Sequence, residues 1–188
     1  ETGDKRRAEA TTWLLQCRLL AFEPLQLAGD DAAAEACHAA ARALAPAHPD
    51  VIAFGWMREL AKCRDELVAL AKAGKPPVLA ADDARAVAAD ADLEKALAQH
   101  PQHAGLLCAR AEWERARGQV LPAMRWYTAA ETADPQCVLA WLGAARLLRE
   151  REKWGEAELQ AKRGLQFRPD PALRQELALA LVGQGKLD

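Results

Sequence analysis

The sequence contains no serine and no asparagine, so neither a serine nucleophile nor an N-glycosylation site can lie within it. Isoleucine and tyrosine each occur once, as Ile52 and Tyr127, and aromatic residues make up only 5% of the chain. Because β-branched and aromatic side chains are the ones that favour strands, a sheet is not expected. The hydrophobic fraction is 51%, and much of it is alanine, a strong helix former. The composition therefore predicts an all-α protein.

Signals of disulfide, membrane and targeting segments are also missing. Five cysteines are spread over 188 residues without a CxxC pair, which favours small buried side chains over a zinc site or a disulfide framework. Unpaired cysteines favour a reducing compartment, so we expect a cytoplasmic protein. No apolar run approaches the roughly 20 residues of a membrane span, and no signal peptide is visible. Because the chain begins at Glu1, a fragment or a processed form is expected, and a periplasmic or secreted location stays an alternative.

Motifs that carry chemistry are scarce as well. The net charge of −2 gives no reason to expect nucleic acid or an anionic membrane as a partner. His100 and His103 have no third metal ligand near them in sequence, and the GQGKLD segment lacks the first glycine and the Ser or Thr of a phosphate loop. No acid, base and nucleophile cluster together. We therefore expect a protein that is not an enzyme, with no catalytic residues, no metal and no cofactor.

Prolines recur at one period. Pro101, Pro135 and Pro169 are spaced 34 residues apart, and proline does not continue a helix interior. The segments 104–135 and 138–169 align with each other over this period. An internal period of this length indicates a stack of helical hairpins, each ending near a proline.

Small residues recur within the aligned segments, where the two helices of a hairpin would have to approach each other. Ala111 aligns with Ala145, and Ala123 aligns with Ala157. Together with Gly118, Tyr127, Ala130, Trp141 and Trp154, they resemble the tetratricopeptide repeat family. The resemblance implies an all-α fold, a right-handed superhelix of antiparallel helical hairpins in which Trp141 is a core residue.

The chain departs from the family pattern at six positions. Leu107 replaces a Trp, Ala161 replaces an aromatic residue and Gly164 replaces an Ala. Glu152 stands where the family has a glycine, and Arg110 and Glu114 stand where it prefers apolar residues.

The repeats divide the chain into two parts. We expect irregular helical hairpins over residues 1–80, including a helix around residues 13–21 and one long helix over 50–74. We expect the repeats over residues 81–188, with full units at about 102–135 and 136–169 and a partial unit at 170–188. The sequence predicts four helical hairpins and a fifth that is cut short, so we expect the native protein to continue beyond Asp188.

The resemblance also implies a concave groove lined by the first helix of each unit. The residues expected to contact a partner there are Cys108, Glu112, Arg115, Leu142, Arg146, Arg149, Glu150, Gln175 and Leu179. Arg115, Arg146 and Arg149 could receive an acidic segment through forked hydrogen bonds. The alternative is that these arginines are solvated or paired with neighbouring glutamates. Charge reversal at Arg146 and Arg149 is expected to weaken binding and to leave the melting temperature nearly unchanged.

The predicted function is a non-enzymatic scaffold that binds a segment of a partner protein in the concave groove, and an acidic segment is the kind that the arginines would suit. One alternative is a regulatory domain that binds a small molecule and controls an attached effector. Another is an accessory domain of an enzyme whose catalytic part lies elsewhere. The family's chaperone-binding subclass uses asparagine, so the lack of this residue argues against that assignment.

Overall fold

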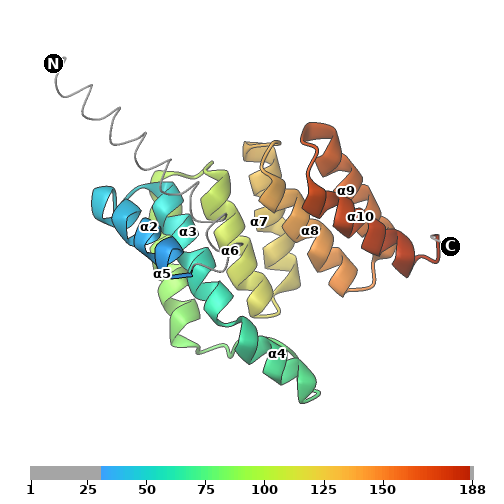
Figure 1. Ribbon diagram of the computed structural model, residues 1–188, viewed down its shortest axis with the longest axis horizontal. Helices are drawn as coiled ribbons and strands as arrows, with labels where there is room; N and C mark the ends of the chain where they lie inside the picture. The colour runs from blue at the N-terminus through green and yellow to red at the C-terminus, as the bar shows by residue number, and fades with distance from the viewer. Residues whose placement is uncertain (1–30, 187–188) are drawn as a thin grey trace.

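The computed structural model describes residues 31–186, and these residues form helices joined by short connections (Figure 1). Within that range there is no strand, which confirms the prediction of an all-α protein. The helix expected around residues 13–21 lies outside the described residues. In chain order the helices are α2 (Asp31–Leu44), α3 (Pro49–Lys62), α4 (Arg64–Lys72), α5 (Ala84–Gln99), α6 (Ala104–Ala116), α7 (Val120–Ala133), α8 (Val138–Glu150), α9 (Trp154–Phe167) and α10 (Pro171–Gly183).

The helices stack in two layers. One layer contains α3, α6, α8 and α10, each in contact with the next. The other layer contains α5, α7 and α9, and each of these packs on the first-layer helices before and after it in the chain. The chain is therefore a helical repeat solenoid built from hairpins, as the sequence predicted (Figure 1).

Alanines make the close approach of the helices possible. Ala111, Ala123, Ala145 and Ala157 are all buried. Trp141 is buried too, and its indole Nε1 donates a hydrogen bond to the carbonyl oxygen of Pro135 at 2.9 Å. Small side chains let two backbones approach, and the large ring fills the space beside the crossing. The burial predicted for these five residues is confirmed, but the Trp141 ring stacks on Phe167 at the end of α9 and packs against Leu173 of α10 rather than on the preceding hairpin.

A left-handed residue follows α4, α6, α8 and α10. The residues are Gly74, Gly118, Glu152 and Gly185, with φ values of 69°, 73°, 58° and 66°. After α8, for example, the N–H of Glu152 donates to the carbonyl oxygen of Arg149 at 2.9 Å, and the N–H of Lys153 donates to the carbonyl oxygen of Leu148 at 3.0 Å. These two bonds close the last turn of the helix. Three of the four turns use glycine, which has no Cβ to oppose this conformation, whereas Glu152 adopts it with a side chain.

An ion network accounts for the polar residues Arg110 and Glu114. Asp90 of α5 accepts from Arg110 Nη1 at 2.7 Å and from Arg117 Nη1 at 2.7 Å. The buried Glu114 pairs with Arg110 Nη2 at 3.2 Å and with Arg117 Nη2 at 2.9 Å. Two carboxylates and two guanidinium groups thus join α5 to α6 at a place where the family uses apolar contacts.

The segment expected as one long helix over residues 50–74 is instead two helices, and that expectation is wrong. α3 ends at Lys62, and the N–H of the buried Cys63 bonds back to Leu60 at 3.0 Å, a tighter turn than an α-helix makes. α4 has no fully buried residue, so the core does not hold it in line with α3. It projects from the solenoid as an arm, at the bottom of Figure 1. The chain returns at Leu79, which is buried and whose N–H donates to Ala116 at 2.8 Å.

Candidate partner-binding face

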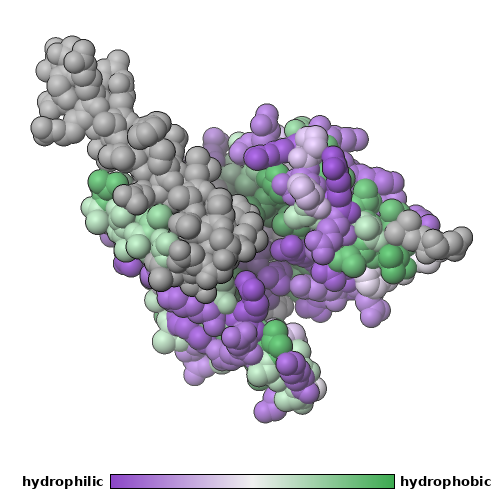
Figure 2. Space-filling view, viewed as in Figure 1, coloured by the Kyte–Doolittle hydropathy of each residue, from purple (hydrophilic) through white to green (hydrophobic). Residues whose placement is uncertain are grey.

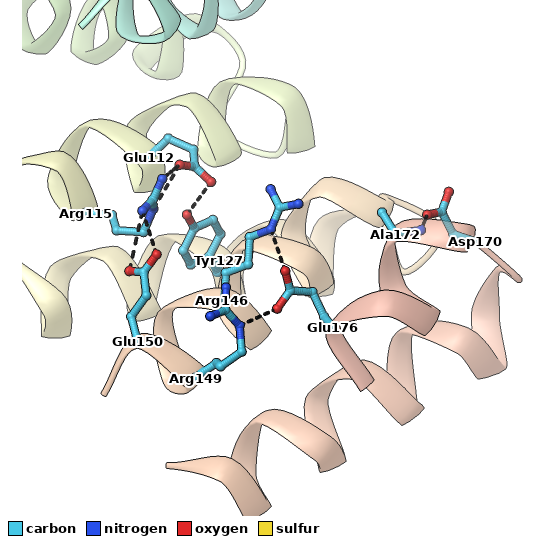
Figure 3. A network of polar contacts seen from close by, with 9 residues as sticks. All are labelled: Glu112, Arg115, Tyr127, Arg146, Arg149, Glu150, Asp170, Ala172 and Glu176. Atoms are coloured by element: carbon cyan, nitrogen blue, oxygen red, sulfur yellow. Dashed lines mark hydrogen bonds and ion pairs between the residues drawn. The ribbon is translucent and has the colours of Figure 1, made fainter. Parts of the chain in front are cut away.

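A polar network crosses α6, α7 and α8 (Figure 3). Glu112 accepts at Oε2 from Arg115 Nε (3.0 Å) and Nη2 (2.8 Å), and at Oε1 from the hydroxyl of Tyr127 (2.6 Å). Arg115 Nη1 also donates to Glu150 Oε1 at 3.1 Å. Arg115 therefore links two successive first helices, α6 and α8, through one guanidinium group.

A second cluster joins α8 to α10. Arg146 Nε donates to Glu176 Oε1 at 3.0 Å, and Arg149 Nε donates to Glu176 Oε2 at 2.7 Å. The side chain of Glu176 is only 6% exposed, whereas those of Arg146 and Arg149 are 44% and 28% exposed. Among residues 31–186, no other group accepts from the Nη atoms of either arginine. One buried carboxylate therefore holds two cations by their Nε edges and leaves their Nη edges available.

Two members of the first network, Tyr127 and Arg115, keep their protonation states near neutral pH. Burial raises the pKa of Tyr127 well above its ordinary value, and the neighbouring Glu112 adds to the effect. Burial acts to lower the pKa of Arg115, but Glu112, Tyr127 and Glu150 outweigh it, so the pKa is raised. Tyr127 thus stays a hydrogen-bond donor and Arg115 stays charged.

The nine residues expected to contact a partner fall into three groups. Cys108 and Leu142 are 1% and 7% exposed, and their side chains belong to the core rather than to a surface. Gln175 and Leu179 are exposed on α10. The other five are charged, and each belongs to one of the two networks: Glu112, Arg115 and Glu150 to the first, and Arg146 and Arg149 to the second.

The pairing of the arginines involves a residue that sequence reasoning missed. Each of Arg115, Arg146 and Arg149 is paired, as the alternative interpretation held, but Arg146 and Arg149 pair with Glu176 rather than with a neighbour in sequence. The available signal was Glu176 itself, the one acidic residue of α10, which directly precedes the apolar run 177–182. A lone acidic residue on an amphipathic helix does not by itself show whether it faces solvent or core.

An apolar cleft adjoins the first network. It has a volume of about 680 Å³ and lies between the α4 arm with the loop after it and the C-terminal ends of α6 and α8. Val68 and Val78 are among its exposed apolar residues, and Figure 2 shows an apolar patch on the projecting arm. Arg64 and Arg151 also line it, and no described carboxylate pairs with their side chains. Arg115 and Glu150 belong both to the cleft and to the network.

His103 of the histidine pair has a structural role. Its Nδ1 accepts from the N–H of Leu106 at 3.3 Å, which caps α6, and its Nε2 lies 3.1 Å from Asp50 Oδ1. Over residues 31–186, no three His, Cys, Asp or Glu side chains gather into a group that could hold a metal ion. In the same range, no helix is both long and apolar enough to cross a membrane.

Comparison with known proteins defines the fold. No family model and no curated protein sequence matches the chain. Among solved structures, the chain is similar to TTC0263, a thermophilic TPR protein of Thermus thermophilus, with a TM-score of 0.61 and 19% identity. The alignment covers 92% of this chain and 84% of that one. The protein therefore has a tetratricopeptide-repeat fold, and the resemblance seen in the sequence is confirmed at the level of the fold.

Proposed function

We propose that the protein is a non-enzymatic scaffold that binds an acidic segment of a partner protein across α6, α8 and α10. The observation that carries this proposal is the anchoring of Arg146 and Arg149 by the buried Glu176. Repeat solenoids with this fold present extended surfaces for protein partners.

The anchoring favours binding for a physical reason. An arginine side chain that is free in solution loses rotamer entropy when it binds, about 0.5–1.5 kcal/mol per immobilised side chain. Glu176 already restrains both guanidinium groups, so less of that entropy remains to be lost. Arg146, Arg149 and Glu176 together carry one net positive charge. Figure 3 shows the Nη atoms of Arg146 turned away from Glu176. A carboxylate can accept two parallel hydrogen bonds from such an edge.

The test uses defined probes. Fluorescent oligo-glutamate and oligo-aspartate peptides, with lysine-containing and neutral peptides of equal length, are titrated against the protein at two salt concentrations. We expect acidic peptides to bind selectively and more weakly at high salt, because exposed charges are screened.

The matched variants keep the positive charges of Arg146 and Arg149 and remove only their planar guanidinium groups. Arg146→Lys with Arg149→Lys leaves two cations beside Glu176 but removes the planar donor edge, and should weaken binding of the acidic peptide about tenfold. Arg174→Lys, on an exposed residue of α10, is the control and should bind like the parent. Equal affinity of the double variant and the parent would contradict the proposal.

The cleft favours a second candidate function, a regulatory domain that binds a small molecule and controls an attached effector. Its volume of about 680 Å³ lies in the range of about 300–1,000 Å³ that is typical of ligand pockets, and its lining is mainly apolar. Arg64 and Arg151 would select a ligand with an apolar body and a negative charge. A thermal-shift screen of anionic metabolites, repeated on Val68→Glu, tests this candidate: stabilisation that the variant loses would support it, and no stabilisation by any of them would count against it.

A further inference from the structure

Two thiols meet at the junction between successive repeats. Cys108 lies on α6 and Cys137 immediately precedes α8, and their Sγ atoms are 3.8 Å apart although the residues are 29 positions apart in the chain. The side chains around them are apolar, including Leu107, Ala130 and Ala140. The proposed scaffold function uses neither thiol.

The two thiols differ in accessibility. Cys108 is 1% exposed, whereas Cys137 is half-buried in the turn between α7 and α8. A small oxidant can therefore reach Cys137 first, and Cys108 is then the only described sulfur in contact with it.

The position of Cys137 also stabilises its thiolate form. The residue is the N-cap of α8, where the positive end of the helix dipole favours a negative charge. The contact with the Cys108 sulfur lowers the pKa of Cys137, and the backbone N–H groups of Ala140 and Leu139 act in the same direction against burial and the Asp134 carboxylate. The same sulfur contact, together with burial, raises the pKa of Cys108. Cys137 is therefore the more readily ionised thiol, and Cys108 stays protonated.

We propose that Cys137 and Cys108 form an oxidation site for hydroperoxides, in which Cys137 reacts first and Cys108 resolves it to a disulfide. The Cys137 thiolate attacks the peroxide, so that an S–O bond forms, the O–O bond breaks and hydroxide leaves. Cys108 then attacks the sulfenic sulfur, the S–S bond forms, the S–O bond breaks, and water leaves with the proton of Cys108. The peroxide gains the two electrons that the two thiols lose.

The geometry asks for a modest movement. A disulfide has an S–S length of about 2.05 Å, so the sulfurs must approach by somewhat less than 2 Å. Cys137 lies in the connection between α7 and α8. Its side chain is therefore less restrained in rotation than one inside a helix. The bond would tie α6 directly to the start of α8, the same two helices that Arg115 links.

Two other cysteines of the chain, Cys63 and Cys37, serve as internal controls for oxidation. Cys63 is buried, and burial raises the pKa of its thiol, so it should oxidise more slowly. Cys37 is half-buried and has no sulfur partner in the described part of the chain. Cys17 lies outside the described residues and is removed by Cys17→Ala in every protein tested.

The experiment is a hydrogen peroxide titration of the whole chain followed by intact mass and tryptic mapping. We expect a loss of two hydrogen masses, reversed by a thiol reductant, and a cross-link between tryptic peptides 96–110 and 126–146. In Cys108→Ala, a sulfenic-acid trap should label Cys137 and the cross-link should vanish. In Cys137→Ala, Cys108 should stay reduced.

Two results on the parent protein would overturn the proposal, whether or not the variants fold. One is oxidation of Cys37 or Cys63 as fast as that of Cys137. The other is conversion of Cys137 to its sulfinic acid while Cys108 remains a free thiol. Circular dichroism of each variant shows whether its own result can be compared with the parent.

Discussion

Gly143 on α8 offers the sharpest test of the packing, because adding a single methyl group there should reverse the usual effect of such a change. A Cβ at this position would lie 2.2 Å from Cε1, 2.5 Å from Cζ and 2.8 Å from Oη of Tyr127. All three distances are shorter than real Cβ contacts allow. The absence of a side chain at Gly143 therefore makes the space that the Tyr127 ring occupies.

The magnitude follows from what the ring can do. In an exposed helix, Gly→Ala stabilises by about 1 kcal/mol. Here Tyr127 is fully buried and its hydroxyl donates to Glu112 at 2.6 Å, so the ring cannot move without losing a hydrogen bond to a charged group. Overpacking costs about 1–3 kcal/mol, and such a hydrogen bond contributes about 1.5–3 kcal/mol. We expect Gly143→Ala to lower the free energy of unfolding by about 2–4 kcal/mol after the gain in helix propensity.

The assay is thermal and urea unfolding of the parent and two variants. For a chain of this size 1 kcal/mol shifts the melting temperature by about 2–4 °C, so Gly143→Ala should melt roughly 4–16 °C lower. Gly155→Ala on α9 is the matched control, because no atom lies within 4 Å of its added Cβ, and it should melt at or above the parent temperature. If Gly143→Ala melted like Gly155→Ala, the packing of α7 on α8 described above would be refuted.

Three further predictions concern other parts of the solenoid. Ala123→Leu and Ala157→Leu should each lower the free energy of unfolding by roughly 1–3 kcal/mol through overpacking at the helix crossings, and urea midpoints equal to that of the parent would contradict the assigned crossings. Glu152→Gly should raise the melting temperature, because a left-handed conformation costs a residue with a side chain about 1–2 kcal/mol, and a lower temperature would show that the side chain matters more than the turn. Burial raises the pKa of Glu131 from its ordinary 4.5 to about 7 against a hydrogen bond from Gln160, so its contribution to stability is present below about pH 4.5 and is lost as the pH rises through 7. Glu131→Gln should therefore gain stability relative to the parent between pH 5 and pH 8, and melting curves that shift in parallel would argue against the raised pKa.

The repeat architecture could be predicted from the sequence because its signals are local. The spacing of Pro101, Pro135 and Pro169 marks where helices end, and alanine at Ala111 and Ala145 is required by any close crossing. The core role of Trp141 could be predicted from its place one turn into a helix, although its ring packs against α9 and α10 rather than the preceding hairpin. Each of these inferences needs only the identity and spacing of residues along the chain.

The break at Cys63 could not be predicted in the same way. The residues of α3 and α4 are compatible with one continuous helix, and no glycine or proline interrupts them between Arg58 and Lys72. What separates the two helices is that Cys63 is buried in the core with residues of α5 and α6, while α4 has no fully buried residue and contacts that core through the partly buried Leu67. Only the tertiary structure decides which part of a long helical stretch is held by packing.

The candidate binding face shows the same division. The sequence placed Arg146 and Arg149 three residues apart on one face of a helix, which needs only the helical period. It did not show that Glu176 lies beneath both of them, 30 and 27 residues further along the chain. Charge reversal at Arg146 and Arg149 was expected to leave the melting temperature nearly unchanged. Because two added carboxylates would face the buried Glu176, we now expect it to lower the melting temperature. The helices and the repeat could therefore be predicted from local sequence patterns. The ion pairs of the candidate binding face depend on contacts between residues far apart in the chain, which only the tertiary structure determines.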